Sequence, residues 1–212
     1  MTNPLLNQTG LPAFSKILPE HVIPAVTQAI DDCRETLENV VNDNKTYTWE
    51  NLIEPLEQVD DRLGKLWSPV SHMNSVVNGD ELRDAYEGCL PLLSEYGTYV
   101  GQHIGLFNAY QQLANSDEYK SLSTAQQKVI DNSLRDFKLS GIDLSDQDKK
   151  RYGEIQTRLS ELGSKFSNNV LDATQAFTVN VTDENELLGL PESALEAAQI
   201  LAKEKELSGW LF

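Results

Sequence analysis

The sequence predicts a mainly α fold: a bundle of long, kinked antiparallel helices with a minor β element near residues 177–182 and the carboxyl end. Three observations lead to this prediction. Over long stretches, apolar residues recur at alternating steps of three and four, the period of an amphipathic helix. Residue types that favour helix N-termini and turns separate these stretches. Near the end of the chain, one short segment instead alternates apolar and polar residues, as a half-buried strand does.

Two long helices are expected in the first part of the chain. The first follows Leu18-Pro19-Glu20 and carries an apolar stripe from Val22 to Val41. The second begins after Thr48, whose hydroxyl is suited to cap the free amides of a helix N-terminus. Its apolar positions are separated by steps of 4, 3, 4, 3, 4, 3 and 4. They are Leu52, Leu56, Val59, Leu63, Leu66, Val70, Met73 and Val77.

Two prolines, Pro55 and Pro69, interrupt the second helix. Proline removes a backbone donor and crowds the preceding turn of a helix. A kink or a break is therefore expected near Ser68-Pro69.

Three further helices are predicted before residue 177. Asn78-Gly79-Asp80 predicts a turn, and so short a connection favours antiparallel neighbours. One helix then runs from Leu82 through Val100 to Tyr110. Ser123-Thr-Ala-Gln126 is a capping box that opens the next, and Ser145-Asp-Gln-Asp148 resembles another, with Asp in place of Glu or Gln. The apolar face of the last helix carries Tyr152, Ile155, Leu159, Leu162, Phe166, Val170 and Ala173.

The end of the chain is expected to contain the β element. Residues 177–181 (FTVNV) alternate apolar and polar side chains and include β-branched residues, which predicts a short strand. Pro191 stands where a first helical residue belongs, ahead of a helix over 194–207. Trp210-Leu211-Phe212 is interpreted as the start of a strand that pairs with 177–181, which suggests a fragment of a longer protein. The division expected is a helical region over 1–176 and a truncated strand-helix-strand start over 177–212, within one continuous domain.

Composition restricts the class of protein. The 17 Lys and Arg residues against 33 Asp and Glu give a formal net charge of −16, which argues against nucleic-acid and anionic-membrane partners. The chain has only two cysteines, Cys33 and Cys89, so no disulfide framework is expected. A reducing compartment is predicted instead. Neither a signal peptide nor an apolar run of roughly 18 residues is present. A cytoplasmic location is predicted.

Motifs that carry chemistry are missing from the sequence. The three histidines, His21, His72 and His103, include no His-Glu-x-x-His or Glu-x-x-His pair. There is also no Cys-x-x-Cys pair, phosphate-binding glycine loop or Gly-x-Ser-x-Gly elbow. No catalytic, metal-binding or cofactor-binding residue is therefore predicted in this chain.

Some residues nevertheless have two interpretations. Asp31-Asp32 with Glu35, and Asp60-Asp61, resemble carboxylates that hold magnesium diphosphate, but solvated acidic faces are expected in so acidic a chain. His103 falls near an apolar stripe, where it is either a structural histidine with both ring nitrogens satisfied, which we favour, or a ligand-binding group. For His72, the sequence favours neither a solvent-facing position nor a position in a groove. The tryptophans, Trp49, Trp67 and Trp210, are expected to be core or interface anchors.

Five stretches are too specific to be generic helix. They are residues 11–26 (LPAFSKILPEHVIPAV), 67–74 (WSPVSHMN), 134–142 (LRDFKLSGI), 151–155 (RYGEI) and 159–174 (LSELGSKFSNNVLDAT). In this order they resemble the amino-terminal region of bacterial members of the thimet oligopeptidase family of zinc metallopeptidases, and the resemblance extends from about residue 3 to Phe212.

The resemblance implies a longer cytoplasmic, largely helical endopeptidase that cuts short peptides, including released signal peptides, in a channel between two lobes. It also implies a zinc ion held by a His-Glu-x-x-His helix and a downstream Glu, none of which matches a position in this chain. The present chain would form a helical channel wall that excludes folded proteins. The catalytic lobe of the same polypeptide would be the partner of this chain. In the absence of that lobe, the surface of this chain that normally packs against it would be exposed, most clearly at Trp210-Leu211-Phe212. The alternative is a free-standing acidic helical module that binds a partner helix or a peptide.

Overall fold

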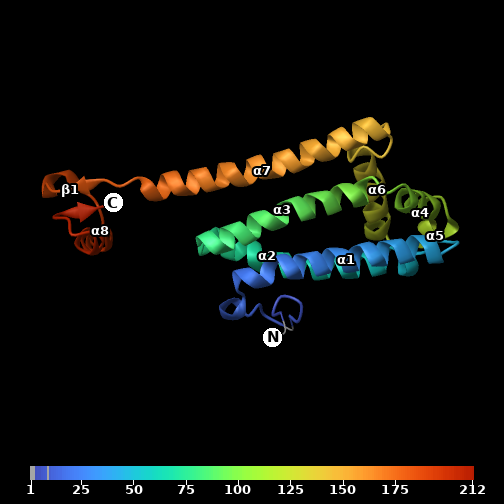
Figure 1. Ribbon diagram of the computed structural model, residues 1–212, viewed down its shortest axis with the longest axis horizontal. Helices are drawn as coiled ribbons and strands as arrows, with labels where there is room; N and C mark the ends of the chain where they lie inside the picture. Colours follow the sequence, from blue (N-terminus) through green and yellow to red (C-terminus); the bar gives the residue numbers. More distant parts are fainter. Residues whose placement is uncertain (1–2, 9) are drawn as a thin grey trace. The chain divides into compact units, whose positions relative to one another are not determined.

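A computed structural model describes residues 3–8 and 10–212, and it confirms the mainly α class (Figure 1). Eight α-helices and two short strands are assigned within the described residues. The helices are α1 (Pro19–Asp43), α2 (Glu54–Val76), α3 (Asp80–Gly101), α4 (Ile104–Ala114), α5 (Asp117–Ser121), α6 (Thr124–Leu139), α7 (Asp146–Ala176) and α8 (Glu192–Glu204). The strands are β1 (Asn180–Val181) and β2 (Trp210–Leu211).

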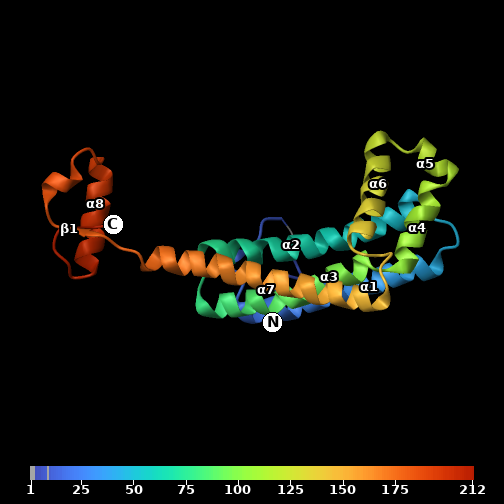
Figure 2. The same cartoon turned by 90° about the horizontal axis from the view of Figure 1, so that it is seen from above.

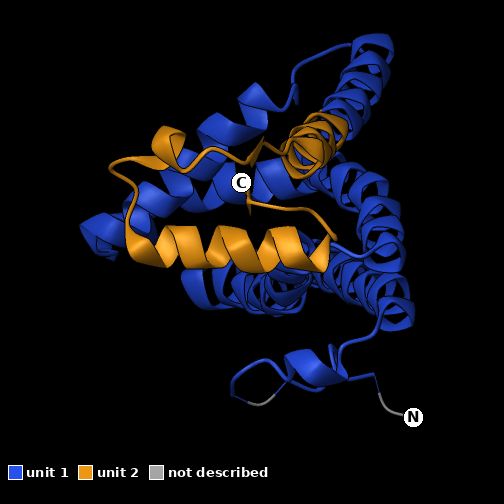
Figure 3. Ribbon diagram, turned by 90° about the vertical axis from the view of Figure 1, so that its left-hand side faces the viewer, with its two compact units in different colours: residues 1–162 blue, residues 163–212 orange. Residues whose placement is uncertain are grey.

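The chain divides into two compact units, residues 1–162 and 163–212, which Figure 3 shows in two colours. The first contains α1 to α6 and the start of α7. The second contains the rest of α7, both strands and α8. The predicted division into regions 1–176 and 177–212 within one continuous domain remains a prediction.

The first unit is organised around α1, α2 and α3, which lie side by side in Figures 1 and 2. The predicted stripes of these helices form one core, because residues three and four apart share a helix face. Its buried members include Val22, Val26 and Cys33 of α1 and Leu63 and Val70 of α2. The predicted stripes are thus confirmed as the core-facing sides of these helices, except that Val77, at the end of the second stripe, is 68% exposed.

A second core lies at the carboxyl end of α1. There Leu37 packs with Leu52 and Ile53, which belong to a π-helical turn at Trp49–Ile53, and with residues of α4 and α6. Phe137 of α6 meets both Phe107 and Tyr110 of α4 edge-on, with ring centroids 5.6 and 5.5 Å apart. The α6 helix crosses the direction of the long helices (Figure 2).

Predicted helix starts are confirmed by hydrogen bonds. The Thr48 hydroxyl accepts from the Asn51 amide at 3.2 Å. Ser123 accepts from the Gln126 amide at 3.3 Å, while the Gln126 side chain accepts from the Ser123 amide at 3.0 Å, which completes the capping box. Ser145 Oγ accepts from the Asp148 backbone amide, as in a capping box. The Asp148 carboxylate, however, accepts from the Ser145 hydroxyl and not from its backbone amide, because the side chain of Asp is one methylene shorter than that of Glu.

Two details of the helix predictions are corrected by the structure. Of the two alternatives expected near Ser68-Pro69, the break does not occur: α2 continues to Val76, and Pro69 is buried. Burial of Leu66 and Val70 on either side stabilises the helix enough to offset one missing backbone bond. A kink at this position remains a prediction. The single helix expected over 82–110 is instead α3 and α4, because the chain leaves helical geometry at Gln102 and His103. The short helix α5 was not predicted.

In the second unit, the predicted strand pairing is confirmed. Val181 pairs with Trp210 and Asn180 with Leu211 in antiparallel register. Gly209 enters this pair with φ +91°, and a Cβ there would lie 2.2 Å from the Val181 carbonyl oxygen, so glycine is required. Pro191 is the N-cap of α8 rather than its first helical residue.

The expectation that Trp210-Leu211-Phe212 forms an exposed apolar end is wrong for Leu211. This side chain is buried because β2 pairs with β1 and packs against α8. Trp210 is half-buried, and only Phe212 keeps substantial exposure.

Candidate functional site

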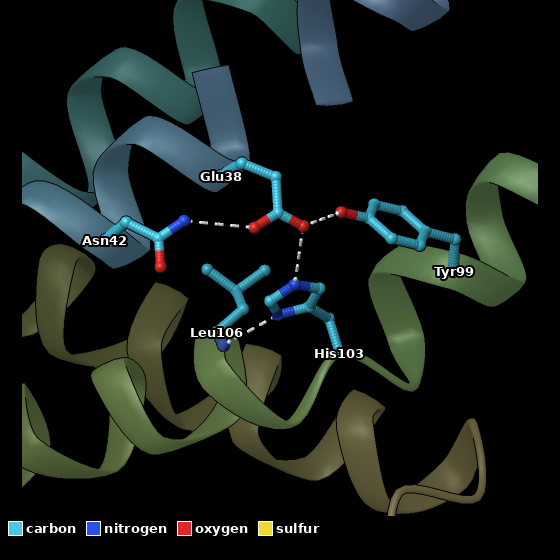
Figure 4. A network of polar contacts seen from close by, with 5 residues as sticks. All are labelled: Glu38, Asn42, Tyr99, His103 and Leu106. Carbon is cyan, nitrogen blue, oxygen red and sulfur yellow. Dashed lines mark hydrogen bonds and ion pairs between the residues drawn. The ribbon is translucent and has the colours of Figure 1, made fainter. Parts of the chain in front are cut away.

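His103 lies at the junction of α3 and α4 and is the N-cap of α4 (Figure 4). Its Nδ1 accepts a hydrogen bond from the Leu106 amide at 3.0 Å. Because Nδ1 accepts, Nε2 carries the proton of the neutral ring and donates to Glu38 Oε1, 3.2 Å away. Both ring nitrogens are therefore satisfied, which confirms the structural interpretation of His103.

Glu38 of α1 is the centre of this network (Figure 4). Its Oε1 also accepts from the Tyr99 hydroxyl of α3 at 2.5 Å, and its Oε2 accepts from the Asn42 amide group at 3.3 Å. The hydrogen bond from Tyr99, then that from His103, lowers the pKa of Glu38 below its ordinary value. Burial and the bond to Glu38 raise the pKa of Tyr99 to about 12. The network joins α1, α3 and α4.

Arg34 extends the network on α1. Its guanidinium lies 4.3 Å from the centroid of the Tyr99 ring and 3.2 Å from Glu95 Oε1. Every member of the network thus has a partner within the fold.

The other polar candidates do not converge. Asp61 pairs with Lys65 of its own helix at 2.5 Å, whereas the neighbouring Asp60 accepts from the Tyr96 hydroxyl of α3 at 3.1 Å. Asp32 accepts from Gln28 at 2.8 Å, so the two acidic pairs have separate partners. Within residues 3–8 and 10–212, no group of three or more His, Cys, Asp or Glu side chains could hold a metal ion. The described residues do not fit a zinc site.

The surroundings of His72, Trp49, Trp67 and the two cysteines are as follows. His72 is exposed beside the ring of Phe14, 5.7 Å between centroids. Trp67 stacks on Tyr86 at 4.8 Å within the first core, and Trp49 packs against the second. The thiols of Cys33 and Cys89 are buried and free, and burial raises the pKa of each to about 11, which keeps them protonated at neutral pH.

A pocket of about 360 Å³ opens between α2, α3, α4 and α6, and the sequence did not predict it. Buried apolar side chains from three of these helices form its floor, among them Leu56, Leu106 and Phe137. The carboxylates of Glu57 and Asp60 border it from α2. Only the pairing of separate helices creates such a pocket, so no local sequence signal marks it.

An apolar surface that lacks cover lies on α7, all of whose residues are described. None of them is buried. The predicted apolar face includes large side chains between 42% and 71% exposed, which we call the α7 stripe. It comprises Ile155, Leu159, Leu162, Phe166 and Val170. Contiguous exposed apolar surface of this kind marks interaction sites.

Comparison with known proteins identifies the family of this helical chain. Residues 25–149 match the family described as Neurolysin/Thimet oligopeptidase, N-terminal domain. The chain belongs to this family. Its match to the amino-terminal domain confirms the resemblance predicted from the five sequence stretches.

Relatives in this family support the assignment over the whole chain. The chain is 63% identical to Oligopeptidase A of Escherichia coli strain K12 over 211 residues, all of this chain and 31% of that protein. It is 60% identical to Oligopeptidase A of Haemophilus influenzae over 212 residues, again 31% of that protein. With the Probable cytosolic oligopeptidase A of Arabidopsis thaliana it shares 36% over 197 residues, 92% of this chain and 28% of the relative. The chain thus spans about a third of the length of these relatives.

Among the residues that the structure describes, every helix is too short or too polar to cross a bilayer.

Proposed function

We propose that this chain is the amino-terminal helical region of a zinc-dependent oligopeptidase that degrades short peptides, including cleaved signal peptides, in the cytoplasm. In this proposal the helices form a wall of the substrate channel and exclude folded proteins. The main support for this proposal is that the chain matches the family's amino-terminal domain and spans 31% of the length of its oligopeptidase A relatives. Peptide hydrolysis belongs to the longer protein.

The zinc ion would be held by residues in the remainder of the polypeptide. The family resemblance implies a His-Glu-x-x-His helix there, and the described residues form no metal-binding group. The contribution of this chain is therefore steric: its long helices bury one face in the two cores and leave other faces free.

The α7 stripe supports a docking role for one of these free faces. An apolar stripe exposed to water is unfavourable. Covering it would stabilise the protein by on the order of 25 cal/mol for each Å² buried. We propose that the catalytic remainder of the same polypeptide packs on this stripe. The relatives contain about two further lengths of chain that could do so.

A free-standing acidic module that binds a partner helix or peptide is the second candidate. The net charge of −16 and the α7 stripe favour it. The gene beyond Phe212 separates the two. A reading frame that continues to His-Glu-x-x-His supports the peptidase, and a stop codon directly after Phe212 supports the module.

The proposed division of labour is tested by cleavage of a quenched fluorescent peptide in the presence of zinc. The 212-residue chain alone should show no chelator-sensitive cleavage. The same chain joined to the remaining length of the E. coli relative should cleave the peptide. Robust, chelator-sensitive cleavage by the chain alone would refute the proposal.

Docking on the α7 stripe is tested in the joined protein with Leu159→Ser and Phe166→Ser together. These changes should lower activity and expose apolar surface to a fluorescent dye, because the interface loses two anchors. Val76→Ser is the matched control, since Val76 is 65% exposed and lies at the end of α2. Equal behaviour of the double variant and the control would contradict docking at this face.

A further inference from the structure

We propose that the pocket between α2, α3, α4 and α6 binds an arginine side chain of a peptide, with its aliphatic part on the apolar floor and its guanidinium at Glu57 and Asp60. This inference rests on the proposed function, which supplies peptides as the class of ligand. It adds a binding site within the wall and a preference for basic residues.

The charge of the pocket is the first argument. Glu57 and Asp60 are three residues apart on α2, so both carboxylates lie on one face of the helix. Among the described residues, no lysine or arginine lines the pocket. Asp136, a third carboxylate at the pocket, is already paired with Arg135 at 2.9 Å. Glu57 and Asp60 have no such cation within the described chain.

The hydrogen bonding of Asp60 is the second argument. Its Oδ1 accepts from the Tyr96 hydroxyl at 3.1 Å, a neutral partner that leaves the negative charge in place. Partial burial raises the pKa of Asp60 above its ordinary value, whereas the bond from Tyr96 lowers it. A cation at this position would offset the cost of holding a carboxylate beside protein atoms. A guanidinium is suited to this task because its fork of donors can meet two carboxylates.

The shape of the pocket is the third argument. Gly97 of α3 borders it, and a Cβ at this position would meet no atom within 4 Å. A volume of about 360 Å³ is at the lower end of the pockets that hold small ligands, which is suitable for one long side chain. The buried leucines and Phe137 match the methylene groups of arginine, which pack on apolar surface while the charged head stays hydrated.

The experiment titrates the 212-residue chain with acetyl-Leu-Arg-Leu-amide and with the same peptide carrying citrulline in place of arginine. Citrulline keeps the shape of the side chain and removes its charge. Binding is followed by calorimetry and by NMR shifts of the Gly97 amide. Saturable binding of the arginine peptide is expected, with about tenfold weaker binding of the citrulline peptide, because a hydrogen-bonded charge pair is lost.

Two variants locate the binding site. Glu57→Gln combined with Asp60→Asn should weaken binding of the arginine peptide about tenfold and leave the citrulline peptide unchanged. Gly97→Leu should abolish binding of both peptides by filling the pocket. Gly64→Leu is its control, because Gly64 is a helical glycine of α2 with equally open surroundings and does not line this pocket. The double variant keeps the test decisive if Gly97→Leu does not fold.

Equal affinity for arginine and citrulline peptides would overturn the proposal. So would wild-type binding by Gly97→Leu, or an absence of saturable binding. The readout is binding without cleavage, so such a result would leave the proposed peptidase function intact. Conversely, the cleavage test of that function does not depend on Glu57 or Asp60.

Discussion

Leu63 and Leu159 occupy equivalent places in two helical apolar stripes, but the structure assigns them opposite environments. Leu63 of α2 is 8% exposed in the first core, whereas Leu159 of α7 is 56% exposed. Truncating each to alanine removes the same three carbon atoms. We predict that Leu63→Ala destabilises the chain strongly and that Leu159→Ala does not.

The magnitude follows from burial. Three buried carbon atoms at about 0.8 kcal/mol each give a transfer cost of about 2.4 kcal/mol for Leu63→Ala. The cavity left behind raises the total into the range of about 2–5 kcal/mol. For Leu159→Ala less than half of the side chain loses cover and no enclosed cavity forms, so a cost below about 1 kcal/mol is expected.

The assay is urea unfolding followed by tryptophan fluorescence. Trp49 and Trp67 both lie in the first compact unit and contact its two cores, so they report on the unit that contains Leu63 and Leu159. The midpoint shift at constant slope gives the change in the free energy of unfolding. A Leu159→Ala cost as large as that of Leu63→Ala would mean that the α7 stripe is covered in solution. A cost below about 1 kcal/mol for Leu63→Ala would mean that the assigned core face is wrong.

Three further predictions test individual contacts. Glu38 has a pKa below its ordinary value of 4.5, so the stability that wild type has over Glu38→Gln should be present at pH 6 and disappear as the pH falls below 4.5 through the folded-state pKa; a difference constant down to pH 3 in unfolding titrations would contradict this. Ser123→Ala should cost about 1 kcal/mol in urea unfolding because it removes the cap of α6; an unchanged midpoint would argue against that bond in solution. Gly209→Ala should perturb Trp210 fluorescence and lower the melting temperature of the second unit more than Gly189→Ala does, because only Gly209 combines a positive φ with a backbone clash; equal effects would exclude the clash.

Local signals predicted most of the fold. The Thr48 and Ser123 caps and the turn at residues 78–80 occur where expected, because these hydrogen bonds and backbone angles involve residues within a few positions of each other. The strand pairing of 179–181 with 210–212 was also predicted. Here the alternating pattern of one segment and the apolar residues of the other indicated that two segments distant in sequence pair with each other.

The candidate sites were less predictable. The partners of His103 could not be named, because Glu38 is 65 residues away and reaches it only when α1 lies against α3 and α4. Asp60 appeared to be one of many solvated carboxylates, and its place beside Tyr96 depends on the packing of α2 against α3. The same holds for the pocket, to which α6 contributes.

The sequence by itself determined the helical class, the apolar face of each long helix and membership of the oligopeptidase family, because periodicity, caps and family motifs are carried by neighbouring residues. Only the tertiary structure decided which faces are used. The stripes of α2 and α7 have the same period, but α2 is covered by α1 and α3 while α7 stays exposed. It also decided that Pro69 does not break α2, since burial of the surrounding side chains outweighs one lost hydrogen bond. Burial depends on what lies opposite a residue, and that partner is distant along the chain.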